Sequence, residues 1–164
     1  MRILLISLVA LGAFTLGANA ASTAAPYLVV LGIAQDAGYP QAGCAKECCE
    51  SAWKDSSAHC FPTSIGLVDP VSGGRWIIDC TPSFPLQLRL LGGFERRPSG
   101  LGLPGVFLTH AHIGHYTGLI HLGREVIGSR SVPVYVMPRM KLFLEQNGPW
   151  SQLVKLENIQ TRPL

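Results

Sequence analysis

Three of the five histidines in this chain of 164 residues lie between positions 110 and 115, and no other feature constrains the fold as much. They follow the apolar run 105–109, which predicts a buried strand, and precede the stretch 116–127, which has helical periodicity. On an extended backbone His110 and His112 point to the same side, and a turn can bring His115 towards them. Imidazole is a ligand that zinc prefers. A lone histidine in a strand is more often a surface residue, but three at this spacing predict a metal site.

The rest of the chain predicts short strands and helices. Strands are predicted at 27–33 (buried), 63–68, 75–79, 105–109 and 132–137, with one or two more between 153 and 164. Helices are predicted from Thr81-Pro82 to Leu91, at 116–127, and from Pro138 to Gln146. The stretches 34–62 and 92–104 are predicted to be loops. The alternation of strands and helices after residue 105 indicates an α/β fold.

The first 20 residues have the pattern of a secretory signal peptide. Arg2 is followed by the apolar run Ile3–Leu16 and by small residues that include Ala18 and Ala20. This run is shorter than the roughly 20 residues that span a bilayer. We therefore expect cleavage after Ala20, a mature chain 21–164 without a stable membrane anchor, and a periplasmic or secreted location.

The charge of the chain argues against nucleic acid as a partner. The net charge is +3, and the densest basic spot is the pair Arg96-Arg97. A nucleic-acid-binding surface needs a basic patch or stripe, so we expect no nucleic-acid partner.

Cysteines gather in the long loop predicted at 34–62. Cys44, Cys48, Cys49 and Cys60 lie there, and Cys80 is the fifth cysteine of the chain. An oxidising compartment permits disulfides, while clustered thiolates also suit a tetrahedral structural zinc, which the neighbouring histidine at position 59 could join. Free thiols are a third alternative, and the odd count leaves at least one cysteine unpaired within the chain.

Several motifs together resemble one known superfamily. Segment 109–115 (THAHIGH) is similar to the His-x-His-x-Asp-His motif of the metallo-β-lactamase superfamily, and the strand ending at Asp79 resembles an earlier strand of that superfamily. Residues 31–44 (LGIAQDAGYPQAGC) resemble the opening of the subgroup that contains the pyrroloquinoline-quinone (PQQ) biosynthesis protein B. The resemblance runs from residue 27 to residue 164.

This resemblance implies a fold and a set of site residues. The fold is an α/β, metallo-β-lactamase-like αβ/βα sandwich, of which residues 21–164 would form mainly the first αβ half, an incomplete domain. The resemblance also implies that His110 and His112 bind a first metal, that His115 binds a second, and that Asp79 supports the histidine segment. The remaining ligands would come from a C-terminal half or from a second chain.

One departure from the superfamily motif weakens the second metal site. The aspartate of the motif would fall at position 114, where this chain has Gly114, which offers no side-chain oxygen. We therefore expect one or two zinc ions, with the second held less well. Asp36, in the long loop, is a candidate catalytic acceptor in place of the missing aspartate, and an Asx-turn is the alternative role for this residue.

These observations predict an exported, metal-dependent hydrolase. Zinc lowers the pKa of a bound water to about 7, so that the water can attack an ester, amide or phosphoester of a small molecule. A non-catalytic binding or carrier protein related to PQQ biosynthesis protein B is the alternative, as is an inactive truncated fragment. Gly114 favours the binding or carrier protein, and the three histidines favour the enzyme.

Overall fold

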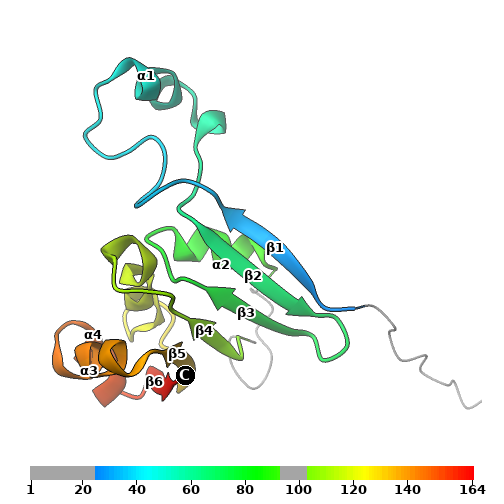
Figure 1. The fold of residues 1–164 in the computed structure, drawn as a ribbon, viewed down its shortest axis with the longest axis vertical. Coiled ribbons are helices and arrows are strands. Elements are labelled where there is room, and N and C mark those ends of the chain that lie inside the picture. Colours follow the sequence, from blue (N-terminus) through cyan, green and yellow to red (C-terminus); the bar gives the residue numbers. More distant parts are fainter. Residues whose placement is uncertain (1–24, 93–102) are drawn as a thin grey trace, which may run out of the picture.

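The structure is a computed structural model that describes residues 25–92 and 103–164. The signal peptide predicted at 1–20 and most of the loop predicted at 92–104 lie outside the described residues. In the described part, one sheet of six strands follows the order of the sequence (Figure 1). The strands are β1 (Tyr27–Gly32), β2 (Ser64–Asp69), β3 (Gly74–Ile78), β4 (Gly105–Phe107), β5 (Val132–Val136) and β6 (Ile159–Pro163). The pairs β1–β2 and β2–β3 are antiparallel, and the pairs from β3 to β6 are parallel.

Helices connect or flank these strands, which confirms the α/β class. The α-helices are α1 (Glu47–Lys54), α2 (Phe84–Leu90), α3 (Pro138–Gln146) and α4 (Trp150–Lys155). Three short 3₁₀ helices are η1 (Ser56–Ala58), η2 (Ile113–His115) and η3 (Thr117–Leu122). Within residues 25–92 and 103–164, no helix has the length and apolar content that crossing a membrane would take.

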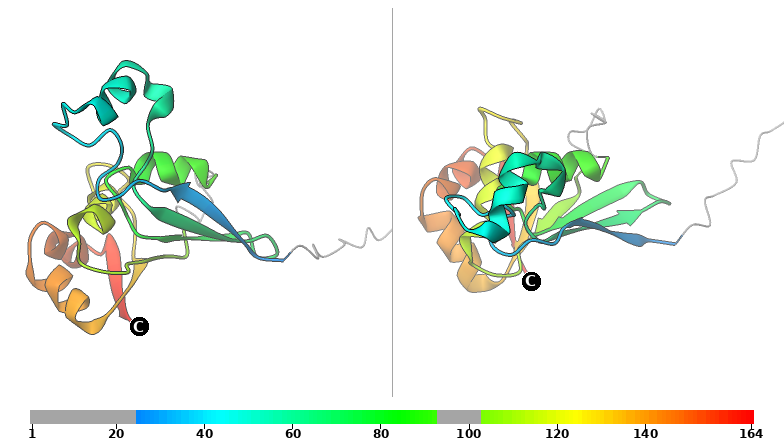
Figure 2. Two further views of the ribbon diagram at one scale, coloured as in Figure 1. Left: turned by 45° about the horizontal axis from the view of Figure 1, so that its top comes forward. Right: turned by 90° about the horizontal axis from the view of Figure 1, so that it is seen from above.

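One face of the sheet is buried and forms the core. Ile77, Val106 and Val134, on three neighbouring strands, are all 0% exposed. α2 lies across this face and adds Phe84 and Leu88 to the same buried cluster (Figure 2). Burial of large apolar side chains is the main favourable term in folding, so this face holds the domain together.

The opposite face of the sheet is apolar but uncovered, and we call it the open face. Its cross-strand neighbours are Leu28, Val30, Ile65, Leu67, Trp76, Ile78, Phe107 and Tyr135. Leu28 is 64% exposed and Val30 is 68% exposed. The prediction that the first strand is buried is therefore wrong. The strand forms, but it lies at the sheet edge and only its alternate side chains meet the core.

The segment after the histidines is not the α-helix predicted at 116–127. It forms η3 instead, because its backbone is pressed against the residues that follow β3. Gly118 donates its N–H to the Cys80 carbonyl at 2.9 Å. A Cβ at Gly118 would lie 2.1 Å from the Thr81 carbonyl oxygen, so only glycine permits this approach.

Three other boundaries differ from the predicted ones. α1 interrupts the predicted loop 34–62, with Glu47 and Glu50 in its first turn and Lys54 in its last, which suits the helix dipole. α2 begins at Phe84 rather than at Thr81-Pro82, with Ser83 as its N-cap. The Thr81 hydroxyl accepts from the Ser83 N–H at 3.1 Å, just before the helix, and donates to the Gln87 side chain at 2.6 Å. The region 153–164 contains the end of α4 and then one strand, β6.

Candidate metal centre

The histidine segment lies just beyond the carboxyl end of β4, beside the end of β3. Asp79 is the first residue after β3, and its N–H donates to the Phe107 carbonyl at the end of β4 at 2.7 Å. Asp79 has a φ of 67°, in the left-handed region that aspartate enters more readily than most residues. The residue is 5% exposed, so its carboxylate is buried next to the histidine segment.

The Asp79 carboxylate accepts hydrogen bonds from two residues of that segment. Its Oδ1 accepts from the Thr109 N–H at 2.9 Å and lies 2.9 Å from Thr109 Oγ1. Its Oδ2 lies 2.9 Å from the same hydroxyl and 2.7 Å from His115 Nδ1. One buried carboxylate therefore fixes both ends of the segment to the core.

These contacts determine which imidazole nitrogens are available as ligands. An ionised carboxylate only accepts hydrogen bonds, so His115 must carry a proton on Nδ1, and its neutral ring has the lone pair on Nε2. Thr109 Oγ1 also lies 2.9 Å from His110 Nδ1. Because the Thr109 hydroxyl gives its proton to Asp79, it accepts from His110 Nδ1, which leaves Nε2 of His110 free as well.

The three histidine rings lie close together. The ring centroids of His110 and His112 are 4.6 Å apart, and those of His110 and His115 are 4.1 Å apart. His110 and His112 are exposed, and His115 is half-buried. The ligand atoms of the three histidines do not all lie within 4.8 Å of one another. Among the described residues, the sulfur atoms of Cys44, Cys48 and Cys49 do meet this condition. The donor set fits zinc, although the three rings do not surround a common point.

Gly114 is buried beneath the loop that carries Asp36. A Cβ built at Gly114 would lie 2.4 Å from the Asp36 carbonyl oxygen and 3.6 Å from its Cα. The aspartate that the superfamily motif has here would therefore collide with the loop. Asp36 is exposed, and its carboxylate has no hydrogen-bond partner among the described residues. The Gly38 N–H, which an Asx-turn at Asp36 would use, donates instead to the Gln35 carbonyl at 3.2 Å.

A cavity of about 350 Å³ opens beside His110. Its lining residues come from the histidine segment and from the start of α3, and they are Leu108, Thr109, His110, Ala111, Met137, Arg139, Met140 and Phe143. The sequence reasoning assigned no role to Thr109 or Arg139. The position of Thr109 in the histidine motif was a signal for the first, whereas nothing in the sequence places Arg139 next to His110.

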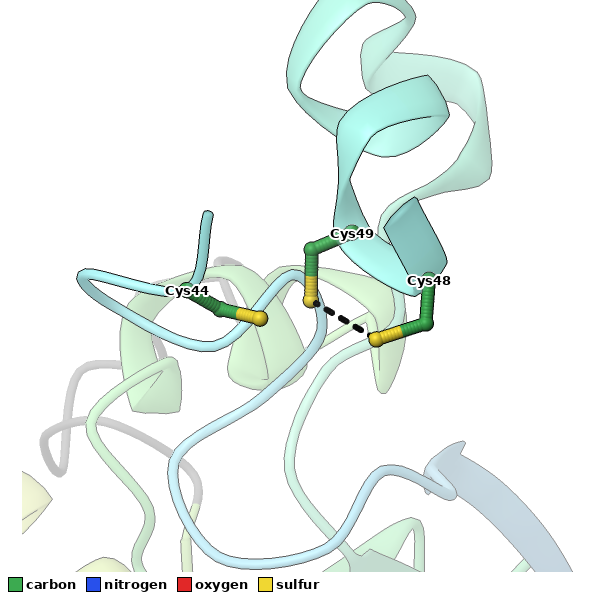
Figure 3. Close-up of side chains that lie close together, drawn as sticks. All are labelled: Cys44, Cys48 and Cys49. Atoms are coloured by element: carbon green, nitrogen blue, oxygen red, sulfur yellow. Dashed lines mark hydrogen bonds between the residues drawn. The ribbon is translucent and has the colours of Figure 1, made fainter. Parts of the chain in front are cut away.

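Three of the four clustered cysteines come together in the structure. The sulfur atoms of Cys44, Cys48 and Cys49 all lie within 4.8 Å of one another (Figure 3). All five cysteines of the chain are free thiols. Cys60 lies outside the cluster, with its Sγ 3.8 Å from the Ala58 carbonyl oxygen. His59 also lies outside the cluster, because its Nε2 contacts the Ala52 carbonyl oxygen at 2.9 Å.

Hydrogen bonds within the cluster shift the pKa values of its thiols in opposite directions. A hydrogen bond from Cys49 lowers the pKa of Cys44, and the same bond raises the pKa of Cys49. Of these two thiols, Cys44 therefore loses its proton first. A thiolate is the form in which cysteine binds metals, so this pair is suited to begin a metal site.

Side chains of the same region hold the cysteine backbone in place. The Tyr39 hydroxyl donates to the Cys48 carbonyl at 2.5 Å, and the Trp53 indole N–H donates to the Cys44 carbonyl at 2.8 Å. Cys80 belongs to a different environment. It is 0% exposed beside Asp79, and burial together with that carboxylate raises the pKa of its thiol.

Comparisons with known proteins find structural likeness only. No family model matches the chain, and no curated protein sequence matches it. The zinc-bound PqqB from Methylobacterium extorquens superposes with a TM-score of 0.67 at 22% identity, over 84% of this chain and 45% of that one. A diphosphatase from the PhnP family superposes with a TM-score of 0.60 at 22% identity, over 85% of this chain and 50% of that one. The chain thus spans about half the length of the solved structures that it matches.

Proposed function

We propose that this chain, which has the metallo-β-lactamase fold, carries the first part of the active site of an exported, zinc-dependent hydrolase. The hydrogen-bond network around Asp79 is the observation that supports this most. It fixes the protonated nitrogen of His115 and His110 and leaves Nε2 of both rings free. A buried carboxylate behind a histidine is the usual support of a zinc ligand.

Each site residue has a distinct role in this proposal. His110, His112 and His115 hold the metal, and Asp79 and Thr109 orient the first and last of these rings. Zinc bound there would supply a Lewis acid and a water of lowered pKa at neutral pH. The substrate would be an ester, amide or phosphoester of a small molecule.

We further propose that Asp36 supplies the acceptor that Gly114 lacks. Its Cα lies 3.6 Å from the position that a Cβ on residue 114 would take. Its carboxylate is exposed, has no partner among the described residues and forms no Asx-turn. It is therefore free to accept a hydrogen bond from a water molecule next to the histidines.

The open face supports a proposal about the rest of the active site. A contiguous exposed apolar surface normally marks a place where another layer packs. The solved structures that match this chain are about twice as long as the matched part. We propose that a second αβ layer, from a longer chain or from another chain, covers the open face and supplies the remaining metal ligands.

We propose a structural zinc for the cysteine cluster, in preference to disulfides. Three sulfur atoms converge on one region, and this suits one ion better than a pairwise bond. The two predicted zinc sites would then differ in kind, because the histidine site would be catalytic and the cysteine site structural.

A non-catalytic binding protein is the second candidate. The observation that favours it is Gly114, since a weakened second site retains affinity for ligands more easily than it retains hydrolysis. Export is proposed for both candidates, from the charged start and apolar run of residues 1–20. Mass spectrometry of the secreted chain, with Ala21 as the expected first residue, tests it.

Zinc analysis of purified variants tests the proposed function. We expect His110→Ala together with His112→Ala to remove one pool of zinc and to leave the pool bound by cysteines. Cys44→Ser with Cys49→Ser should do the reverse, while Cys60→Ser should change neither pool. In a protein that includes the proposed second αβ layer, hydrolysis of a panel of aryl esters and aryl phosphodiesters should then follow the histidine pool. Unchanged zinc content in the histidine variant would refute the proposal, and histidine-bound zinc without any turnover in that completed protein would favour the binding protein.

A further inference from the structure

The cavity beside His110 has two chemically different walls. Leu108, Met140 and Phe143 give it an apolar interior, and His110 lies on one side. Arg139 lines the cavity from the first turn of α3. A volume of about 350 Å³ is at the lower end of the range for small-molecule pockets. The cavity therefore has room for a small apolar group, and the Arg139 side chain adds a positive charge to its lining.

Arg139 is in an electrostatically unfavourable position in the free protein. The side chain is exposed and has no hydrogen-bond or ion-pair partner among the described residues. It lies at the amino end of α3, where the helix dipole is positive and cations are disfavoured. No side chain caps this helix end either. A negatively charged group in the cavity would compensate for the unpaired charge and for the uncapped helix end. It would pair with the guanidinium and accept hydrogen bonds from the free N–H groups of the first turn.

We infer that this cavity binds an oxyanion carried by a small apolar group, with Arg139 as the specificity-determining residue. The inference rests on the proposed function in one respect, which is that His110 marks the reacting end of the substrate. The guanidinium forms paired hydrogen bonds to carboxylate and to phosphate, so both share the required chemistry. The substrate of the proposed hydrolase would then contain such a group next to an apolar part.

Calorimetric titration of the 164-residue chain tests this inference without any need for turnover. The probes are phenylphosphonate and phenylacetate, with benzyl alcohol as the neutral counterpart and inorganic phosphate as the anion without an apolar part. We expect the two aryl anions to bind and both control compounds to bind at least about tenfold more weakly. The tighter of the two anions identifies the head group.

Variants then assign the binding to Arg139. Arg139→Gln should weaken the aryl anions by about ten- to a hundredfold, and Arg139→Lys should restore part of the loss, because lysine keeps the charge without the paired geometry. Arg124→Gln is the matched control, since Arg124 is also exposed but does not line the cavity. Equal binding of benzyl alcohol, or an equal loss in Arg124→Gln, would overturn the inference.

The same titrations separate this inference from the proposed function. They are repeated with a chelator and with His112→Ala, a residue that does not line the cavity. Anion binding that survives both treatments supports the cavity even where zinc binding fails. Anion binding that disappears with the metal and is indifferent to Arg139→Gln would place the anion on the metal and overturn the role of Arg139.

Discussion

The histidine segment and the cysteine lobe (residues 39–60) are two candidate metal sites that the chain builds in different ways. The histidine segment is tied to the core, because the buried Asp79 carboxylate holds Thr109 and His115. The cysteine lobe projects from the sheet with α1 at its outer end (Figure 2). Its cysteine backbone is held by groups of the lobe itself, Tyr39 and Trp53.

Because of this difference, a metal ion would have a different effect at the histidine segment and in the cysteine lobe. At the histidine segment Thr109 and Asp79 already orient two of the three rings, His110 and His115, so an ion would add chemistry more than structure. In the lobe, three sulfurs converge from one half-buried, one exposed and one buried cysteine, so an ion would act as the cross-link between them. Binding free energy at such a site appears as folding free energy.

Asp79→Asn tests the anchoring of the histidine segment and should have the largest effect. The amide cannot accept from both Thr109 and His115 with the strength of a carboxylate, and a buried donor would lose its partner. We expect the free energy of unfolding to fall by about 3–5 kcal/mol in urea titrations. Asp69→Asn is the control, because that carboxylate caps the exposed turn after β2, and its loss should cost much less. Equal losses in the two variants would mean that Asp79 is not an anchor.

Gly114→Ala tests whether the two regions depend on each other, since the loop that leads to the lobe passes over Gly114. The new Cβ would lie 2.4 Å from the Asp36 carbonyl oxygen, so the loop must move. We expect a loss of about 2 kcal/mol in the free energy of unfolding, together with weaker protection of residues 33–40 in hydrogen exchange. Gly148→Ala should be nearly neutral, because nothing lies within 4 Å of the added carbon. A harmless Gly114→Ala would show that the loop adjusts freely.

Cys49→Ser tests whether the lobe relies on its metal. The substitution removes one sulfur ligand, so we expect zinc affinity of the cluster to fall by about tenfold or more, equivalent to about 1.4 kcal/mol. Amide exchange in α1 should accelerate, while exchange at Thr109 and His115 should stay the same. Cys60→Ser provides the comparison, as Cys60 lies outside the cluster. Acceleration in both regions, or in neither, would contradict the independence of the two regions.

Thiol ionisation gives the smallest expected contrast between the regions. Burial and Asp79 raise the pKa of Cys80 in the folded chain. Its contribution to stability is therefore present below the unfolded pKa of about 8.5 and is lost as the pH rises above it. We expect the free energy of unfolding to decrease by about 1 kcal/mol per pH unit beyond that point, and Cys80→Ala to have a shallower slope. Alkylation at neutral pH should modify Cys44 and spare Cys80, and rapid labelling of Cys80 in the folded chain would refute this.

The sequence predicted those parts of the fold that depend on local pattern. The strands from β2 to β5 appear where alternating or β-forming runs placed them, and α3 begins at Pro138 because proline fits the first turn of a helix. The exposure of β1 could not be predicted, because an apolar run does not reveal whether a second layer covers it. The 3₁₀ helix η3 after His115 depends on Gly118 meeting the Cys80 carbonyl, a contact between distant segments.

The candidate site likewise has some features that the local sequence predicts and others that depend on contacts between distant segments. The spacing of His110, His112 and His115 is local, and the structure brings their rings together. The packing of the Asp36 backbone on Gly114 joins two segments far apart in the sequence, and so does the cavity between His110 and Arg139. No pattern within one segment contains that information.

The left-handed backbone at Asp79 has a consequence for mutational tolerance. With φ at 67° the position admits glycine, asparagine and aspartate at low cost, whereas its contacts require a carboxylate. Glutamate keeps the charge but not the backbone preference, and asparagine keeps the backbone preference but not the charge. In a library with all twenty amino acids at position 79, we expect a single acceptable solution. Because the backbone and the contacts at position 79 impose two separate requirements, we expect Asp79 to be the least replaceable residue of the site.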